Sequence, residues 1–192
     1  STTFSITFLM SLYLQYINGM EPKIAGTVLM AQPVMMAFLS PITGKQSDRI
    51  EPRFLATTGM VITAIGVFLF SQIGFDTSIY LIVANLFFMG IGFALFSSPN
   101  MTAIMGTVGP KHYGLASGTV STMRLLGQMA SMAIATVALA LIVGREVITA
   151  DKYELFLRSV HMVFMISTVL CLVGVYFSWF RGAVLNSNST EK

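Results

Sequence analysis

Residues 44–53 read Gly44-Lys45-Gln46-Ser47-Asp48-Arg49-Ile50-Glu51-Pro52-Arg53, and five of these ten residues are charged. On each side lie about twenty residues without any charge, at positions 25–43 and 54–74. A helix that spans a bilayer needs about 20 apolar residues, and short loops rich in Lys and Arg connect such helices on the cytoplasmic side. We therefore predict that the chain crosses a membrane, turns in water over residues 44–53 and crosses back.

The composition also indicates a membrane protein. Of the 192 residues, 55% are hydrophobic and only 10% are charged, whereas a typical soluble domain is about 25% charged. So few charges cannot cover the surface of a soluble fold, and lipid is the expected solvent. The net charge of +3 comes from basic residues in short loops, not interleaved with aromatic residues on a polar face, and this pattern excludes nucleic-acid binding. The single cysteine, Cys171, lies in an apolar run without metal-ligand spacing, and we expect no metal or other cofactor.

The hydrophobic pattern predicts an all-α membrane protein with six transmembrane helices. The apolar runs lack the alternation of membrane strands, and the short connections between them make neighbouring helices antiparallel. Pro33 and Pro41 are expected to interrupt the second helix and Pro99 to end the fourth, either as ordinary kinks or as bends used in a transport cycle. The six helices are expected at residues 3–17, 25–43, 54–73, 79–98, 113–143 and 157–180.

The ends of the chain and its charges predict its organisation in the membrane. Residues 1–16 are uncharged and apolar and lack the basic start and the small-residue cleavage site of a signal peptide. We therefore expect a spanning helix that has lost its first turns, as in a fragment of a longer protein. Residues 1–181 are expected to form one six-helix domain, and residues 182–192 a disordered cytoplasmic tail. Six Lys and Arg residues lie on the side of the C-terminus and four on the other, which places the C-terminus in the cytoplasm.

The fifth predicted helix carries a polar stripe at helical spacing. Its members recur at steps of four and three residues on one face, and a polar face at lipid depth must contact protein or a watery cavity. Arg124 is the only charged residue well inside a predicted helix. It fits a bond to carbonyl groups at a helix end, a gating contact with another domain, or direct contact with a substrate. The stripe consists of Ser117, Ser121, Arg124, Gln128 and Ser131.

Three single amides occur in the other helices: Gln15, Gln32 and Asn85. Each fits a residue that lines a passage or one that forms a hydrogen bond between helices. Together with Gln128 and Ser131 they are the substrate-cavity candidates. Their distribution predicts that the first, second, fourth and fifth helices face inward and that the third and sixth face lipid.

Other features add packing or limit the chemistry. Gly114 and Gly118 form a G-x-x-x-G spacing, which allows helix backbones to approach closely. Enzyme signatures such as H-E-x-x-H and G-x-S-x-G are missing from the sequence. His161, in the sixth helix, fits a packing or interface residue better than a proton relay. No Asp or Glu lies deep in a predicted helix, where a proton-coupled transporter normally needs one.

Two stretches resemble a known family. In residues 44–53, glycine, three residues, Asp-Arg and a further Arg resemble the cytoplasmic loop signature of the major facilitator superfamily, with a departure at residues 51–52, where the family usually has a glycine and a basic residue. Residues 96–128 resemble the fourteen-helix drug:proton antiporter branch. The matching segments are Phe96-Ser97-Ser98-Pro99-Asn100, Ile104-Met105-Gly106, Gly114-Leu115-Ala116-Ser117-Gly118, Thr122-Met123-Arg124 and Gly127-Gln128.

The resemblance covers essentially the whole chain and implies the C-terminal six-helix half of such a transporter, built of 3+3 inverted repeats. It implies that Asp48 and Arg49, assisted by Arg53, form cytoplasmic charge contacts that hold one conformation closed. Gly44 completes this motif, and Arg124 is grouped with it as a gating residue. A solvated loop that merely orients the chain is the alternative role for residues 44–53.

We therefore expect proton-coupled efflux of hydrophobic or cationic drugs by alternating access, in the plasma membrane. The expected partners are such a small substrate, protons, the lipid bilayer and an N-terminal half that supplies the proton-binding carboxylates. Transport of another small solute is an alternative within the same class. A membrane-embedded enzyme with catalytic residues outside this sequence, or a non-transporting scaffold or sensor, is an alternative from a different class.

Overall fold

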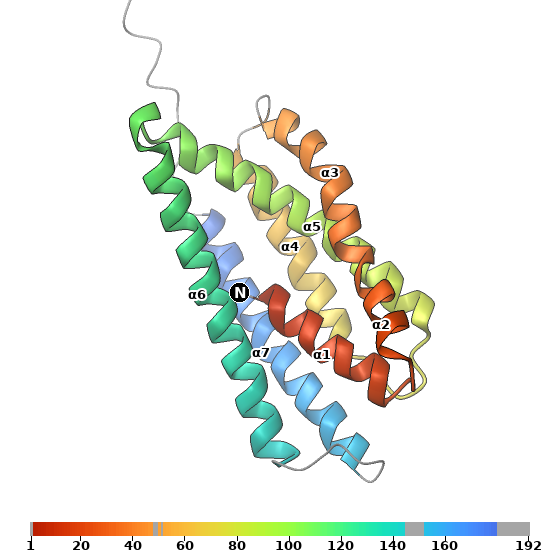
Figure 1. Ribbon diagram of the computed structural model, residues 1–192. Helices are drawn as coiled ribbons and strands as arrows, with labels where there is room; N and C mark the ends of the chain where they lie inside the picture. Colours follow the sequence, from red (N-terminus) through yellow and green to blue (C-terminus); the bar gives the residue numbers. More distant parts are fainter. Residues whose placement is uncertain (1, 48–49, 51, 145–151, 180–192) are drawn as a thin grey trace, which may run out of the picture.

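The computed structural model of the protein is a bundle of roughly antiparallel helices (Figure 1). It describes residues 2–47, 50, 52–144 and 152–179. A short 3₁₀ turn, η1 (Pro110–His112), precedes the sixth α-helix. The α-helices are α1 (Thr2–Tyr16), α2 (Pro22–Leu29), α3 (Ala31–Ser47), α4 (Pro52–Phe70), α5 (Ile79–Gly106), α6 (Tyr113–Ile142) and α7 (Tyr153–Trp179).

Within the described residues, α2 and α3 follow one another and together form a single candidate span, Pro22–Gln46. Four segments are long and apolar enough to cross a bilayer, and Phe54–Phe70 is a shorter apolar helix. α1 contributes a further 15 residues beside α6 and α7. The prediction of an all-α membrane fold is thereby confirmed, and the helices correspond in number and order to the six predicted runs when α2 and α3 are taken as one. The four long spans are Pro22–Gln46, Ile79–Gly106, Pro110–Ile142 and Tyr153–Ser178.

The second span breaks one turn before Pro33. Proline lacks the N–H that would bond to the carbonyl of residue 29, and its ring crowds that carbonyl. α2 accordingly ends at Leu29, and α3 resumes with the Val34 amide bonded to the Met30 carbonyl at 3.0 Å. The predicted interruption at Pro41 is wrong, since this residue lies inside α3.

The prediction that Pro99 ends the fourth span is also wrong. α5 continues through Pro99 to Gly106. Without water to satisfy freed backbone groups, a membrane helix continues past a proline more readily than it stops. α7 starts at Tyr153, four residues before the predicted start. The prediction followed the apolar run, and a helix can begin before its apolar run begins.

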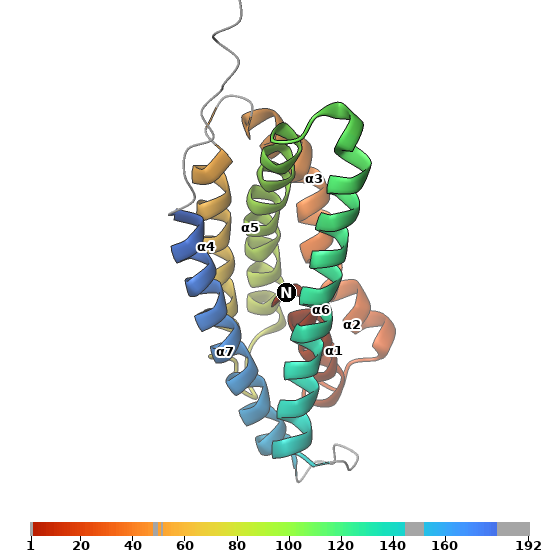
Figure 2. The same ribbon diagram turned by 90° about the vertical axis from the view of Figure 1, so that its left-hand side faces the viewer.

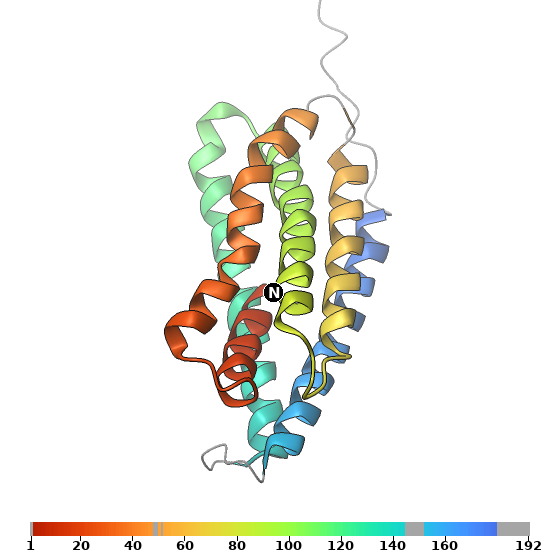
Figure 3. The same ribbon diagram turned by 90° about the vertical axis from the view of Figure 1, so that its right-hand side faces the viewer.

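The buried apolar core is formed mainly by α1 together with α4, α5, α6 and α7. The closest packing between helices is in a block where α5 lies between α3 and α4 (Figure 3). Glycines allow the backbones to touch: an added Cβ at Gly59 of α4 would lie 2.5 Å from the Gly92 carbonyl oxygen of α5. On the other side, a Cβ at Gly90 would lie 2.7 Å from the Gln32 carbonyl oxygen of α3. These contacts make the three helices a closely packed unit.

α4 and α7 form one flank of the bundle, side by side in Figures 2 and 3. Their outward faces carry exposed apolar side chains at helical spacing, including Phe54, Ile65 and Phe68 on α4 and Met165 and Val169 on α7. These faces have the character of a lipid-facing surface. α6 approaches α7 at one end of the bundle and diverges from it toward the other (Figure 2).

Candidate functional site

The polar stripe of α6 lies on the face that packs into the bundle. At the C-terminal end of the stripe, which is the lower end in Figure 1, Ser131 is only 6% exposed. The Ser5 hydroxyl of α1 donates to the Ser131 carbonyl oxygen at 2.8 Å, and the two hydroxyls also bond to each other. The same register continues with Ala135 and Ala138, which are both buried. At Ser131 the stripe therefore faces α1 and not lipid.

The upper part of this face has a different environment. Ser117, Ser121 and Gln128 are half-buried, whereas Arg124 is exposed. The Arg124 guanidinium forms no ion pair or hydrogen bond with the part of the chain that the structure describes. In this region α6 stands apart from α7 (Figure 2). A guanidinium presents several donors and stays charged, so this face can bind an anionic or acceptor group from outside the described chain.

Two of the predicted amides are buried at contacts between helices. Gln32 is 5% exposed in the first turn of α3, where its backbone carbonyl approaches Gly90 of α5. Asn85 of α5 is 9% exposed, and its Nδ2 donates to the Gly66 carbonyl oxygen of α4 at 2.9 Å. Asn85 thus bonds toward the α4 flank and away from α6.

Asn85 also lines a cavity of about 260 Å³ between α4, α5 and the loop that joins them. Its Oδ1 is buried without a hydrogen-bond partner among the described residues. Gln72 and Thr77 are the other polar residues of this cavity, and the remaining lining is apolar: Leu69, Phe70, Ile73, Leu81 and Ile82.

The five substrate-cavity candidates do not converge on one place. The Gln15 side chain bonds within α1, its Nε2 donating to the Ser11 hydroxyl at 2.9 Å and to the Ser11 carbonyl at 3.1 Å. Ser131 is engaged by α1, and Asn85 by α4. Only Gln128 shares a face with Arg124 and lacks a side-chain partner in the described chain. For all five, contact with a substrate stays a prediction.

The two stretches that carry the family resemblance meet in space. Gly44 near the end of α3 lies against α5, where an added Cβ would be 3.1 Å from the Ser98 hydroxyl. Beside it, Thr43 Oγ1 donates to the Ala94 carbonyl oxygen at 3.1 Å. A small residue at position 44 therefore favours the close approach of α3 and α5, since a side chain there would press on Ser98.

The charged residues of the 44–53 loop that are predicted to act in gating lie wholly or partly outside the residues that the structure describes. Asp48 and Arg49 are not among the described residues, nor is the side chain of Arg53, and the tail 182–192 is likewise outside. Gly114 and Gly118 of α6 have no atom within 4 Å of an added Cβ. The gating role of Asp48, Arg49 and Arg53 stays a prediction, and so does the packing role of Gly114 and Gly118.

Side chains of α1 and α7 hold the α4–α5 loop through hydrogen bonds that were not predicted from the sequence. The Tyr13 hydroxyl of α1 donates to the Gly74 carbonyl oxygen at 2.6 Å. His161 Nε2 of α7 lies 2.5 Å from the Ile73 carbonyl oxygen, to which it donates because a carbonyl can only accept. Thr77 closes the loop by accepting the Gly74 amide at 2.8 Å. The partners are backbone carbonyls, which leave no signature in a sequence.

Comparison with known proteins identifies the family to which this chain belongs. Residues 1–191 match the model of the Major Facilitator Superfamily. The riboflavin transporter RibZ of Clostridioides difficile is 25% identical over 183 residues, which cover 92% of this chain and 39% of that protein. The uncharacterized transporter YebQ of Escherichia coli is 30% identical over 127 residues, 66% of this chain and 28% of its own. The multidrug resistance protein Stp of Mycobacterium tuberculosis is 27% identical over 133 residues, with shares of 68% and 24%.

The chain thus spans between about a quarter and two fifths of the length of these relatives. No solved structure matches it. The family consists of transporters and not of enzymes, which removes the alternative of a membrane-embedded enzyme. Since the match extends over nearly the whole sequence and both signature stretches lie within it, this chain is a member of the Major Facilitator Superfamily.

Proposed function

We propose that this chain is the C-terminal half of a secondary transporter that exports hydrophobic or cationic compounds by alternating access. An N-terminal half outside this sequence completes the central passage, and proton entry drives export. Support comes from family membership and from the similarity to Stp, which is described as a multidrug resistance protein. The proposal includes a cytoplasmic C-terminus, on the basis of the Lys and Arg distribution, and a location in the plasma membrane.

The observation that carries the proposal is the α6 face. Its lower part is closed by the Ser5–Ser131 contact, whereas its upper part presents an exposed Arg124 without an ion pair in the described chain. A cation at lipid depth costs at least about 2.5–3.5 kcal/mol on insertion scales, so such residues face a watery cavity or a partner. The upper α6 face is accordingly assigned to the passage or to the seam between the halves.

Arg124 has a defined role in this proposal. A permanent cation repels cationic substrates, so Arg124 does not bind them directly; it contacts acceptor groups of the other half and stabilises one conformation of the cycle. The substrate itself is held by apolar and aromatic surface, which suits loosely specified hydrophobic compounds. The carboxylates that carry the proton belong to the other half, because no acidic residue lies deep in the described spans.

Transport by the full-length protein in vesicles tests this function. We expect a fluorescent lipophilic cation to accumulate on the export side only while a proton gradient is imposed. Arg124→Gln should lower the rate at least about tenfold, and Arg124→Lys should retain part of it. Lys111→Gln serves as the matched control, because it removes one exposed charge from the turn before α6. A wild-type protein that neither moves the dye nor responds to the gradient would refute the proposed export.

A second candidate function is transport of a planar, uncharged aromatic solute. RibZ, a riboflavin transporter, aligns over 92% of this chain, more than the aligned share for YebQ or Stp. The same vesicles distinguish the two candidates: uptake of riboflavin, unaffected by a lipophilic cation, supports the solute transporter. Movement of the cation without riboflavin supports export of drugs.

A further inference from the structure

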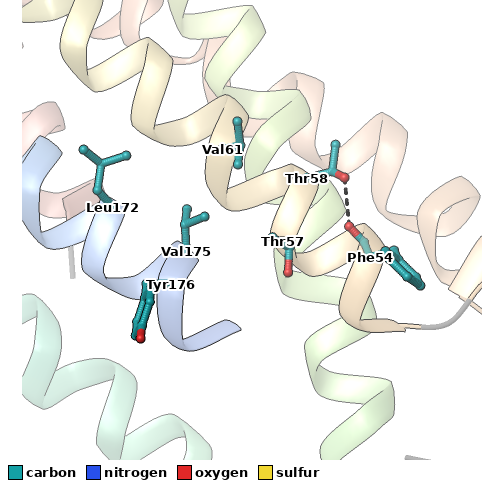
Figure 4. Close-up of a pocket in the computed structure, with 7 residues that line it drawn as sticks. All are labelled: Phe54, Thr57, Thr58, Val61, Leu172, Val175 and Tyr176. Atoms are coloured by element: carbon teal, nitrogen blue, oxygen red, sulfur yellow. Dashed lines mark hydrogen bonds between the residues drawn. The ribbon is translucent and has the colours of Figure 1, made fainter. Parts of the chain in front are cut away.

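A groove of about 510 Å³ opens on the outer side of the bundle, between α4 and α7 (Figure 4). It lies away from the α6 face assigned to the passage, because α4 and α7 form the opposite flank. Its walls come from both helices: Phe54, Thr57, Thr58 and Val61 of α4, and Leu172, Val175 and Tyr176 of α7.

The groove presents hydrocarbon and offers no unsatisfied threonine hydroxyl to a ligand. Thr57 Oγ1 bonds to Ser178 Oγ at 2.9 Å, and Thr58 Oγ1 donates to the Phe54 carbonyl oxygen at 2.8 Å. A polar ligand would lose its hydrogen bonds to water without gaining replacements from these groups. The chemistry of the walls therefore selects an apolar chain.

The position of the groove fixes where that chain comes from. α4 begins at Pro52, so Val61 lies roughly 14 Å along the helix at 1.5 Å per residue. This is about the thickness of one leaflet, which is half of a hydrocarbon core of roughly 30 Å. The groove also continues the exposed apolar surface of this flank, where Phe54 is 44%, Ile65 46% and Val169 58% exposed.

We propose that the groove is a binding site for one acyl chain of a phospholipid. The lipid belongs to the leaflet at the membrane face where α4 begins and α7 ends. Tyr176, 61% exposed at the rim, lies at the depth where aromatic side chains favour the membrane interface. The acyl chain fills the space between the two helices and supports the α4–α7 contact. The site follows from the membrane embedding of the fold and does not depend on which solute is transported.

Photocrosslinking of the full-length transporter tests the site. The probe is a phosphatidylethanolamine with a photoreactive diazirine in its acyl chain, and adducts are located by mass spectrometry of peptides. The protein is extracted in detergent and challenged with short-chain detergent before irradiation. We expect the bound lipid to be retained and to form adducts on residues 54–61 and 172–176. Val175→Trp fills the groove from α7 and should lower these adducts at least about fivefold.

A second groove variant and a matched control keep the test independent of folding. Val61→Trp fills the groove from α4 and should have the same effect as Val175→Trp. Ile65→Trp adds the same side chain to the same exposed face of α4, outside the groove, and should leave labelling of residues 54–61 unchanged. Equal labelling in all three variants, or adducts spread evenly over α6 and the α4–α7 flank, would overturn the proposal, because the lipid would then be ordinary surrounding solvent.

Discussion

Replacing Gly59 by alanine should separate α4 from α5. An alanine Cβ at this position would lie 2.5 Å from the Gly92 carbonyl oxygen and 2.7 Å from the Phe96 amide nitrogen. Both atoms belong to the backbone of α5, so no side-chain rotation relieves the contact. Real Cβ contacts are not shorter than about 3.0 Å, and the helices must move apart by at least about 0.5 Å.

The magnitude follows from this separation. A radial gap of about 0.5–1 Å forfeits a quarter to a half of the dispersion energy of the contacts it opens, and overpacking in a filled core typically costs about 1–3 kcal/mol. Gly59 lies where the two backbones touch, so we place Gly59→Ala in the upper part of that range, at roughly 2–3 kcal/mol. For a domain of this size, such a loss lowers the melting temperature by about 4–12 °C.

Thermal melting of the full-length transporter in detergent, followed by the fraction that stays monodisperse, measures this effect. Gly26→Ala is the matched control, because Gly26 lies inside α2 with no atom within 4 Å of an added Cβ. It should be neutral or stabilising by up to about 1 kcal/mol, since alanine favours the helix over glycine. Adding Gly92→Ala to Gly59→Ala should cost less than the two changes taken separately, because the helices have already moved apart. A Gly59→Ala protein that melts with the wild type would show that α4 and α5 do not approach as described.

Removing either of two hydrogen bonds should lower the stability by a smaller amount, which the same melting assay measures. Tyr13→Phe removes the bond to the Gly74 carbonyl and should cost about 1–2 kcal/mol, whereas Tyr80→Phe, at a side chain that is 87% exposed, should change nothing. Ser131→Ala removes one hydroxyl of the Ser5 contact and should cost about 0.6 kcal/mol, the average for such bonds between membrane helices. A loss for Ser131→Ala as large as that for Tyr13→Phe would contradict this ranking.

The spans could be predicted because their cause is local. A run of apolar residues with the length of a bilayer has few other stable environments, and charge-rich residues 44–53 mark a turn by themselves. The orientation of the α6 stripe was also predictable, since polar side chains at four- and three-residue steps share a face whatever the neighbours are. Ser131, buried against Ser5, agrees with that orientation at one end of the stripe, whereas Arg124 is exposed.

Helix ends and side-chain partners could not be predicted in the same way. Pro99 is a helix breaker in water, but the absence of water around the freed carbonyl favours continuation, and α5 extends to Gly106. Asn85 pairs with a backbone carbonyl on α4 because Gly66 has no side chain there. A sequence shows that an amide is present at lipid depth, but which neighbouring helix satisfies it depends on the packing of the whole bundle.

The α6 face connects these two kinds of result. One register of four and three residues runs from Ser117 through Ser131 to Ala138, but its composition changes at Ser131 from polar to small and apolar. Below that point the face is buried by α1 and α7, and small side chains allow the approach. Above it, polar side chains on the same face would be a liability if they met lipid, since each unpaired group costs free energy there. Water or a polar partner along the N-terminal half of α6 would explain their presence there, and this is the face to which the proposal assigns the passage.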